Sequence, residues 1–105
     1  MAETEEMLHL CMRVRDYLSR KDYKQCNEEI CYAMYLHPHA PEPHNLMGIL
    51  LEVERDHAGA MKHFRASQDL DPTYRPALEN MMDFARFDQK HPRCRFTFSD
   101  CDYAD

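Results

Sequence analysis

PEPHNLMGILLEVERDHAGAMKHFRASQDLDPTY, residues 41–74, is the stretch that decides the fold. Its apolar residues recur three and four positions apart, the spacing of a helix-turn-helix unit that buries one stripe of each helix. Small residues stand where the two helices would cross, and larger apolar residues fill the seam between them, at Gly48 and Ala60 and then at Leu51, Phe64 and Leu70. Pro72 is expected to close the second helix because proline cannot continue it.

The residues before this stretch repeat its pattern. Apolar side chains over residues 5–19 follow helical spacing, with Thr4 as the predicted N-cap. Asp22 is predicted to cap a second helix that runs to about Leu36, and Gln25 is placed to complete a capping box with it. The buried face of this second helix is expected at Tyr23, Cys26, Ile30 and Ala33.

Shifted by 34 residues, the first helix pair aligns with the second. The shift pairs Val14 with Gly48, Tyr17 with Leu51, Asp22 with Asp56, Cys26 with Ala60, Ile30 with Phe64, Ala33 with Ser67, Leu36 with Leu70 and Pro38 with Pro72. Both units resemble the tetratricopeptide repeat, a helix-turn-helix motif of about 34 residues. Val14 and Cys26 depart from the small residues typical of that family, so a wider helix crossing is expected in the first unit.

The resemblance implies an all-α fold, a right-handed α-solenoid of antiparallel helix pairs with about five helices and an extended C-terminal tail. One domain covers residues 1–105, because this length supports a single modest core. Repeat one is predicted at 7–40 and repeat two at 41–74. A capping helix is predicted at 75–89, and Pro92 together with alternating polar and apolar residues predicts an extended tail at 90–105.

Composition narrows the classes of function. The chain is 44% hydrophobic and 30% charged, as expected for a folded protein, and its net charge of -6 argues against nucleic acid as a partner. No apolar run approaches the length of a membrane span and the start is acidic, so no membrane association and a cytoplasmic location are expected. The five cysteines lack CxxC pairs and are predicted to be reduced thiols.

No motif for catalysis or for a cofactor is present, and two glycines cannot build a phosphate-binding loop. The chain is therefore not expected to be an enzyme or to hold a cofactor. Two groups have the residue types of a metal site but no specific spacing: His37, His39 and His44, and His91 with Cys94 and Cys101. No metal site is predicted, and His44 is expected to face a neighbouring helix.

The resemblance also implies a concave groove lined by the first helix of each pair. The positions that match are Leu8, Cys11, Met12, Arg15, Glu42, Asn45, Leu46, Ile49, Glu79, Asn80 and Asp83. Among them, the predicted peptide-binding residues are Met12, Arg15, Asn45, Ile49, Glu79, Asn80 and Asp83. The polar ones are suited to bond a peptide backbone and the apolar ones to adaptable contact. An alternative is that Leu8, Leu46 and Ile49 only pack between helices.

The clamp with which some family members hold a C-terminal carboxylate is not intact. Asn45 matches it, but Cys11, Pro76 and Asn80 stand where basic residues are needed. Acidic groove residues would repel a carboxylate terminus, so an apolar or basic segment is the expected ligand.

Three readings of function follow. The leading one is a protein-protein interaction module that holds a peptide or helix of a partner protein in its groove. The second is a self-associating structural subunit, a homodimer formed through the groove, the capping helix or the tail. The third is a small acidic chaperone specific for a client. The tail carries Phe96, Phe98 and Tyr103 and is expected to pack into this groove or a neighbour's.

Overall fold

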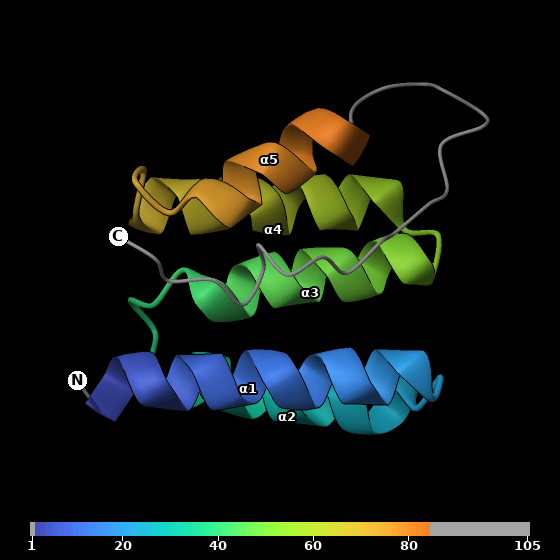
Figure 1. Ribbon diagram of the computed structural model, residues 1–105. Helices are drawn as coiled ribbons and strands as arrows, with labels where there is room; N and C mark the ends of the chain where they lie inside the picture. Colours follow the sequence, from blue (N-terminus) through green and yellow to red (C-terminus); the bar gives the residue numbers. More distant parts are fainter. Residues whose placement is uncertain (1, 85–105) are drawn as a thin grey trace.

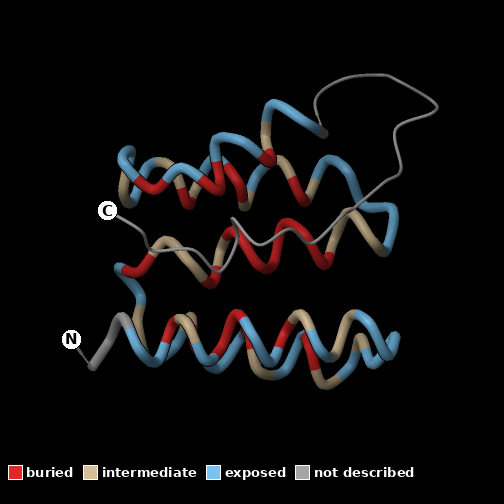
Figure 2. The backbone as a smooth tube through the Cα atoms, in the orientation of Figure 1, coloured by how far each residue is buried: buried red, intermediate tan, exposed pale blue. Residues whose placement is uncertain are grey.

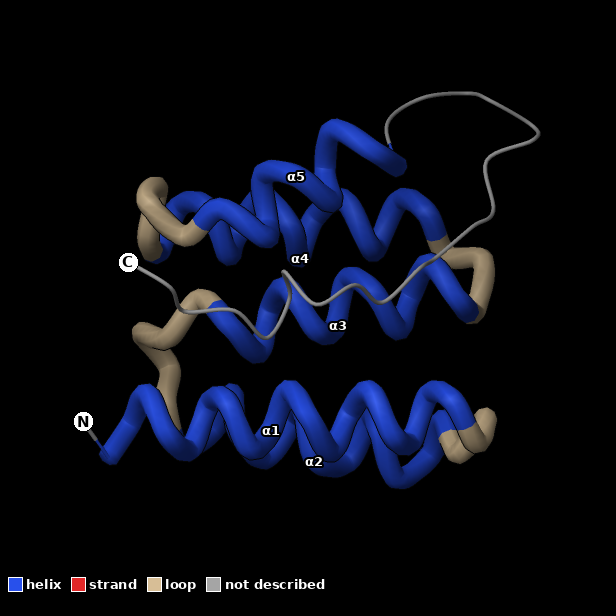
Figure 3. The backbone as a smooth tube through the Cα atoms, in the orientation of Figure 1, coloured by secondary structure: helices blue, strands red, loops and turns tan. Residues whose placement is uncertain are grey.

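The structure, a computed structural model, describes residues 2–84, and its side chains from residue 5 to residue 83. Five α-helices occupy this range, and it contains no strand (Figure 3). They are α1 (Ala2–Ser19), α2 (Tyr23–Leu36), α3 (Glu42–Val53), α4 (His57–Leu70) and α5 (Arg75–Phe84). The all-α prediction is confirmed for the described residues, whereas the predicted extended tail and residues 85–89 of the predicted cap lie outside them.

The helices run up and down in chain order. α1 and α2 lie antiparallel, α3 and α4 form a second antiparallel pair, and α5 packs on α4 (Figure 1). The central helix α3 contacts all four others. Its six consecutive residues from Asn45 to Leu50 are all buried, as expected for a helix with neighbours on every side (Figure 2).

Local structure repeats along the chain with a period of 34 residues. α2 and α4 begin at Tyr23 and His57 and end at Leu36 and Leu70, so both ends differ by 34 positions. The Asp22 carboxylate caps α2 by accepting a hydrogen bond from the backbone N–H of Gln25 (3.3 Å). Asp56 caps α4 in the same way, accepting from Gly59 (3.0 Å). These caps satisfy backbone donors that the first helical turn leaves unpaired.

The turns inside the two pairs are also the same. Lys21 and Arg55, 34 positions apart, both have left-handed backbone conformation, with φ values of 60° and 69°. The next N–H in each turn reaches back five residues, from Asp22 to the Tyr17 carbonyl (2.9 Å) and from Asp56 to that of Leu51 (2.8 Å). This is the Schellman pattern that ends a helix sharply and lets the chain reverse.

Two details differ from the sequence prediction. Thr4 lies inside α1, which starts at Ala2, so it is not the N-cap; acidic residues at Glu3, Glu5 and Glu6 favour helix here because they complement the helix dipole. Gln25 does not complete a capping box. Its side-chain amide instead donates to Glu29 one turn later (3.4 Å), where the carboxylate also receives bonds from α1.

Candidate interaction groove

The groove predicted from the family resemblance lies on α1, α3 and α5, where α3 contacts both α1 and α5. Met12, Glu79 and Asp83 are exposed along it, and Arg15 is half-buried. Asn45, Ile49 and Asn80 are buried. The predicted site residues therefore fall into an accessible set at the edges and a buried set in the middle.

Asn45 and Asn80 contact each other. The Asn80 side-chain amide donates to the Asn45 carbonyl oxygen at 2.9 Å, joining α5 to α3 through a buried hydrogen bond. Because buried amides are costly to leave without partners, this bond fixes the position of α5 against α3. Both residues were predicted to bond a ligand's backbone, and in the folded chain they also hold the groove together.

The accessible edge of the groove is acidic at α5. Glu79 and Asp83 lie one turn apart on the same side of that helix. Arg75 approaches Glu79 at 3.9 Å, a long and exposed ion pair that contributes little to stability. Arg15, on α1, is the groove's cation. A ligand with basic residues near α5 and acidic residues near α1 would match this distribution.

A histidine pair joins α3 to α4. The Nδ1 atoms of His44 and His63 are 3.2 Å apart and the rings stack with their centroids 5.4 Å apart. Burial, and then the neighbouring His63, lowers the pKa of His44; burial likewise lowers the pKa of His63, while Asp56 acts in the opposite direction. The predicted contact of His44 with a neighbouring helix is confirmed, but His63 was missed.

The histidines considered as metal ligands do not come together. His37 contacts Glu6 at 3.2 Å and His39 is exposed, both away from the pair formed by His44. Among the residues that the structure describes, no group of three or more histidine, cysteine or acidic side chains is placed to hold a metal ion. The group of His91, Cys94 and Cys101 lies outside those residues.

The cysteines differ from the prediction of reduced thiols. Cys26 and Cys31 are free, in agreement with it, but Cys11 in the groove is disulfide-bonded. The prediction is wrong for Cys11 because spacing along the chain says nothing about cysteines that the fold brings together. Its partner lies outside the described residues.

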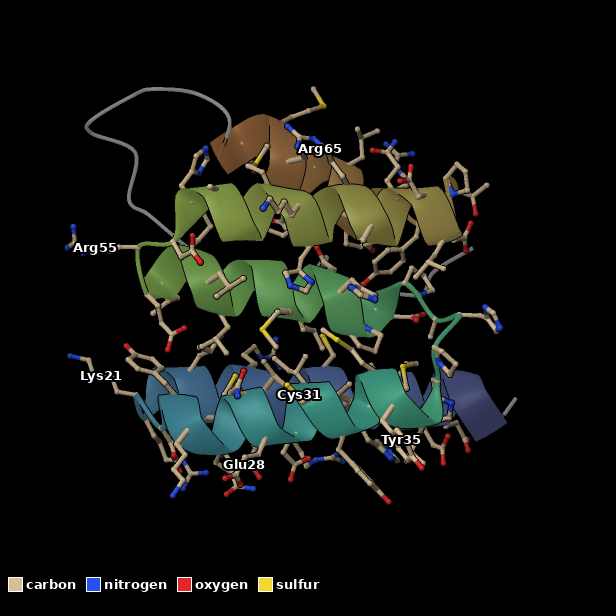
Figure 4. All side chains as sticks on the ribbon, turned by 180° about the vertical axis from the view of Figure 1, so that it is seen from behind. Lys21, Glu28, Cys31, Tyr35, Arg55 and Arg65 are labelled. Atoms are coloured by element: carbon tan, nitrogen blue, oxygen red, sulfur yellow. The ribbon has the colours of Figure 1, made fainter. Side chains whose placement is uncertain are left out.

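The opposite face of the molecule carries an apolar patch that the sequence analysis did not single out. Tyr32, Tyr35 and Leu36 on α2 have 63%, 80% and 49% of their surface exposed. Tyr35 is labelled on this face in Figure 4, which views the molecule from behind. A signal was available: these residues lie beside, and not on, the Cys26–Ile30–Ala33 stripe that serves the core.

No helix within residues 2–84 has the combination of length and apolar character needed to cross a membrane. Comparisons with protein-family models, with curated proteins and with solved structures find no match. The argument for function therefore rests on the geometry of the chain itself.

Proposed function

We propose that the chain is a tetratricopeptide-like interaction module, without catalysis, that binds a segment of a partner protein in the groove of α1, α3 and α5. The observation that carries the proposal is the 34-residue repetition of helix ends, aspartate caps and left-handed turn residues in the two pairs. A repeat of this period, with helix pairs stacked on one another, is typical of modules that present a groove to peptides.

The packing at the helix crossing supports the same assignment. At Gly48 an added Cβ would lie 2.4 Å from the ring of Phe64, so α3 and α4 approach each other at a position that only glycine fits. A small residue against an aromatic one at this position is part of the resemblance to the repeat family. The close crossing holds the pair rigid, so the first helices can present fixed side chains to a ligand.

The chemistry of the groove favours a basic or apolar ligand segment. Glu79 and Asp83 supply exposed negative charge, and Met12, 47% exposed, supplies a flexible apolar contact. A segment carrying lysine or arginine beside an apolar residue satisfies both. A free C-terminal carboxylate does not, because two carboxylates at the groove edge repel it.

The test is affinity capture with a charge-reversed groove. The variant Glu79→Lys with Asp83→Lys changes only exposed side chains, so the fold is expected to survive. The matched control, Glu28→Lys with Asp69→Lys, makes the same change in net charge on exposed positions of α2 and α4. We expect the intact chain and the control to retain a common partner that the groove variant loses at least tenfold. Equal capture by all three proteins contradicts the proposal.

A second candidate function, self-association, is favoured by the patch on α2. Tyr32, Tyr35 and Leu36 form an exposed stripe over one turn of helix, at the end of the stack away from α5. Pairing two such stripes would bury apolar surface that now faces water. Light scattering at high micromolar concentration tests this. A dimer that dissociates in Tyr35→Lys supports it, and a monomer at every concentration excludes it.

A further inference from the structure

The middle of the groove is closed. Cys11 on α1 has 1% of its surface exposed, and Asn45 and Ile49 on α3 have none. Residues at the groove's edges, such as Met12 and Glu79, are exposed. Residues in the centre of a vacant peptide groove are expected to expose part of their side chains, since that is where a ligand makes contact. The burial therefore requires an account of what covers this face.

Cys11 supplies a second, independent observation. It is disulfide-bonded, whereas Cys26 and Cys31 are free thiols. The chain has five cysteines, and the remaining two are Cys94 and Cys101. Both belong to the last sixteen residues, 90–105.

We propose that residues 90–105 of this chain occupy the groove and are tied to Cys11 through Cys94 or Cys101. The groove then has a resident ligand, and a partner competes with it. The inference deepens the proposed function and rests on it only in that the partner is assigned to this same groove. The covalent link itself requires no partner.

The chain is long enough to make this connection. α5 and α1 both contact α3, and packed helices lie about 8–10 Å apart, so their axes are separated by roughly 20 Å at most. Ten residues separate Phe84, the last residue of α5, from Cys94. Fully extended, ten residues reach about 33 Å. Either cysteine can therefore arrive at Cys11.

The charges of the tail match those of the groove. Arg93 and Arg95 come first along the tail, and Asp100 and Asp102 follow. The groove is acidic at α5, where the tail starts, and its Arg15 lies one turn beyond Cys11 on α1. Laid from α5 toward α1, the tail sets its arginines against Glu79 and Asp83 and its aspartates against Arg15.

Closure of the link is a thiol–disulfide exchange. The Cys11 thiol and one tail thiol lose two protons and form one S–S bond, while a low-molecular-weight disulfide accepts two electrons and becomes two thiols. A dithiol reductant reverses the reaction. Cys26 does not compete, because burial and then nearby Glu54, Asp22 and Glu29 raise its pKa to about 12 and keep it protonated. Reduction would free the tail, so the groove opens under reducing conditions.

Peptide mapping tests the link directly. The intact chain is purified without reductant, alkylated, and digested without reduction. We expect one cross-linked peptide that joins Cys11 to Cys94 or Cys101 within a monomeric chain, with Cys26 and Cys31 as thiols. Alkylated Cys11, or a Cys11 link to a second copy, overturns the proposal. Either result leaves the capture test of the proposed function unaffected.

Binding in trans tests whether the tail is a groove ligand. The probe is a fluorescent peptide of residues 90–105 with serine in place of both cysteines. We expect the full chain with Cys94→Ser and Cys101→Ser to bind it at least tenfold more tightly than the oxidised wild type, because the covalent tail no longer excludes it. Cys31→Ser, an exposed free thiol, is the control and should match the wild type. Equal affinities, or no binding to any protein, overturn the proposal.

Discussion

The two helix pairs follow the same backbone course but fill their seams differently. In α3–α4, Gly48 lies against the fully buried ring of Phe64. The equivalent positions in α1–α2 are Val14 and Ile30, both also fully buried. One pair therefore combines the smallest residue with a large one, and the other combines two of middle size. The shared caps and turns set the path, while side-chain volume is exchanged across the seam.

The comparison is broken most strongly at Phe64. Replacing it with alanine removes a buried ring that Gly48 cannot compensate, so Phe64→Ala is expected to cost about 3–5 kcal/mol of unfolding free energy. Ile30→Val, which trims the equivalent position by one methylene, should cost only about 0.5–1.5 kcal/mol. Urea denaturation followed by circular dichroism measures both. Similar costs for the two variants would mean that the seam of α3–α4 collapses to refill the space.

Gly48 and Val14 should respond in opposite directions to side-chain size. Gly48→Ala places a Cβ 2.4 Å from Phe64, and such overpacking costs about 1–3 kcal/mol. Val14→Ala instead loses two buried methyl groups, worth about 1.6 kcal/mol.

A double variant sharpens this point. Gly48→Ala combined with Phe64→Leu gives the second pair a seam closer to that of the first, and it should be more stable than the sum of the two single changes by about 0.5–3 kcal/mol. The same chemical denaturation measures it. Strict additivity would show that the two positions do not share the space assigned to them.

The second pair alone carries a histidine pair, so the pH dependence of the two pairs should differ. The counterparts of His44 and His63 in the first pair are Leu10 and Glu29. Burial holds the folded-state pKa of both histidines below the ordinary value of about 6.5, so the unfolded chain binds protons first as the pH falls. Stability contributed by the neutral pair is present above pH ~6.5 and is lost on acidification through the lower folded-state pKa.

The expected slope is at most about 1.4 kcal/mol per pH unit for each histidine. Thermal unfolding between pH 5 and pH 8 measures it. His44→Gln with His63→Gln should flatten the dependence, and the exposed control His39→Gln should leave it unchanged. An unchanged slope in the double variant would assign the acid sensitivity to other groups.

Much of the fold could be predicted because its signals are local. Helix α2 and its Asp22 cap follow from residue type and spacing, and the shift of 34 residues placed α4 by the same means. The all-α class follows from these alone. The predicted wider crossing at Val14 stays a prediction.

What could not be predicted depends on which helices meet. The Asn45–Asn80 bond and the His44–His63 pair join residues 35 and 19 positions apart on different helices, and the link of Cys11 is longer still or lies beyond the described chain. Helical periodicity shows which face a residue occupies, but it does not show which side chain lies opposite. Contacts across helices therefore had to come from the structure.

The smallest expected effect tests what the two pairs share. Lys21 and Arg55 occupy the left-handed turn position in their respective pairs and lie on the surface (Figure 4). Side chains with a Cβ are strained there and glycine is not, so Lys21→Gly and Arg55→Gly should each stabilise the chain by roughly 0.5–1 kcal/mol. Lys24→Gly, inside α2, is the control and should destabilise by about 1 kcal/mol. Thermal melts measure all three. Gains of equal size at both turns would establish that the pairs repeat in energy as well as in geometry, whereas a gain at one turn only would confine the likeness to the backbone trace.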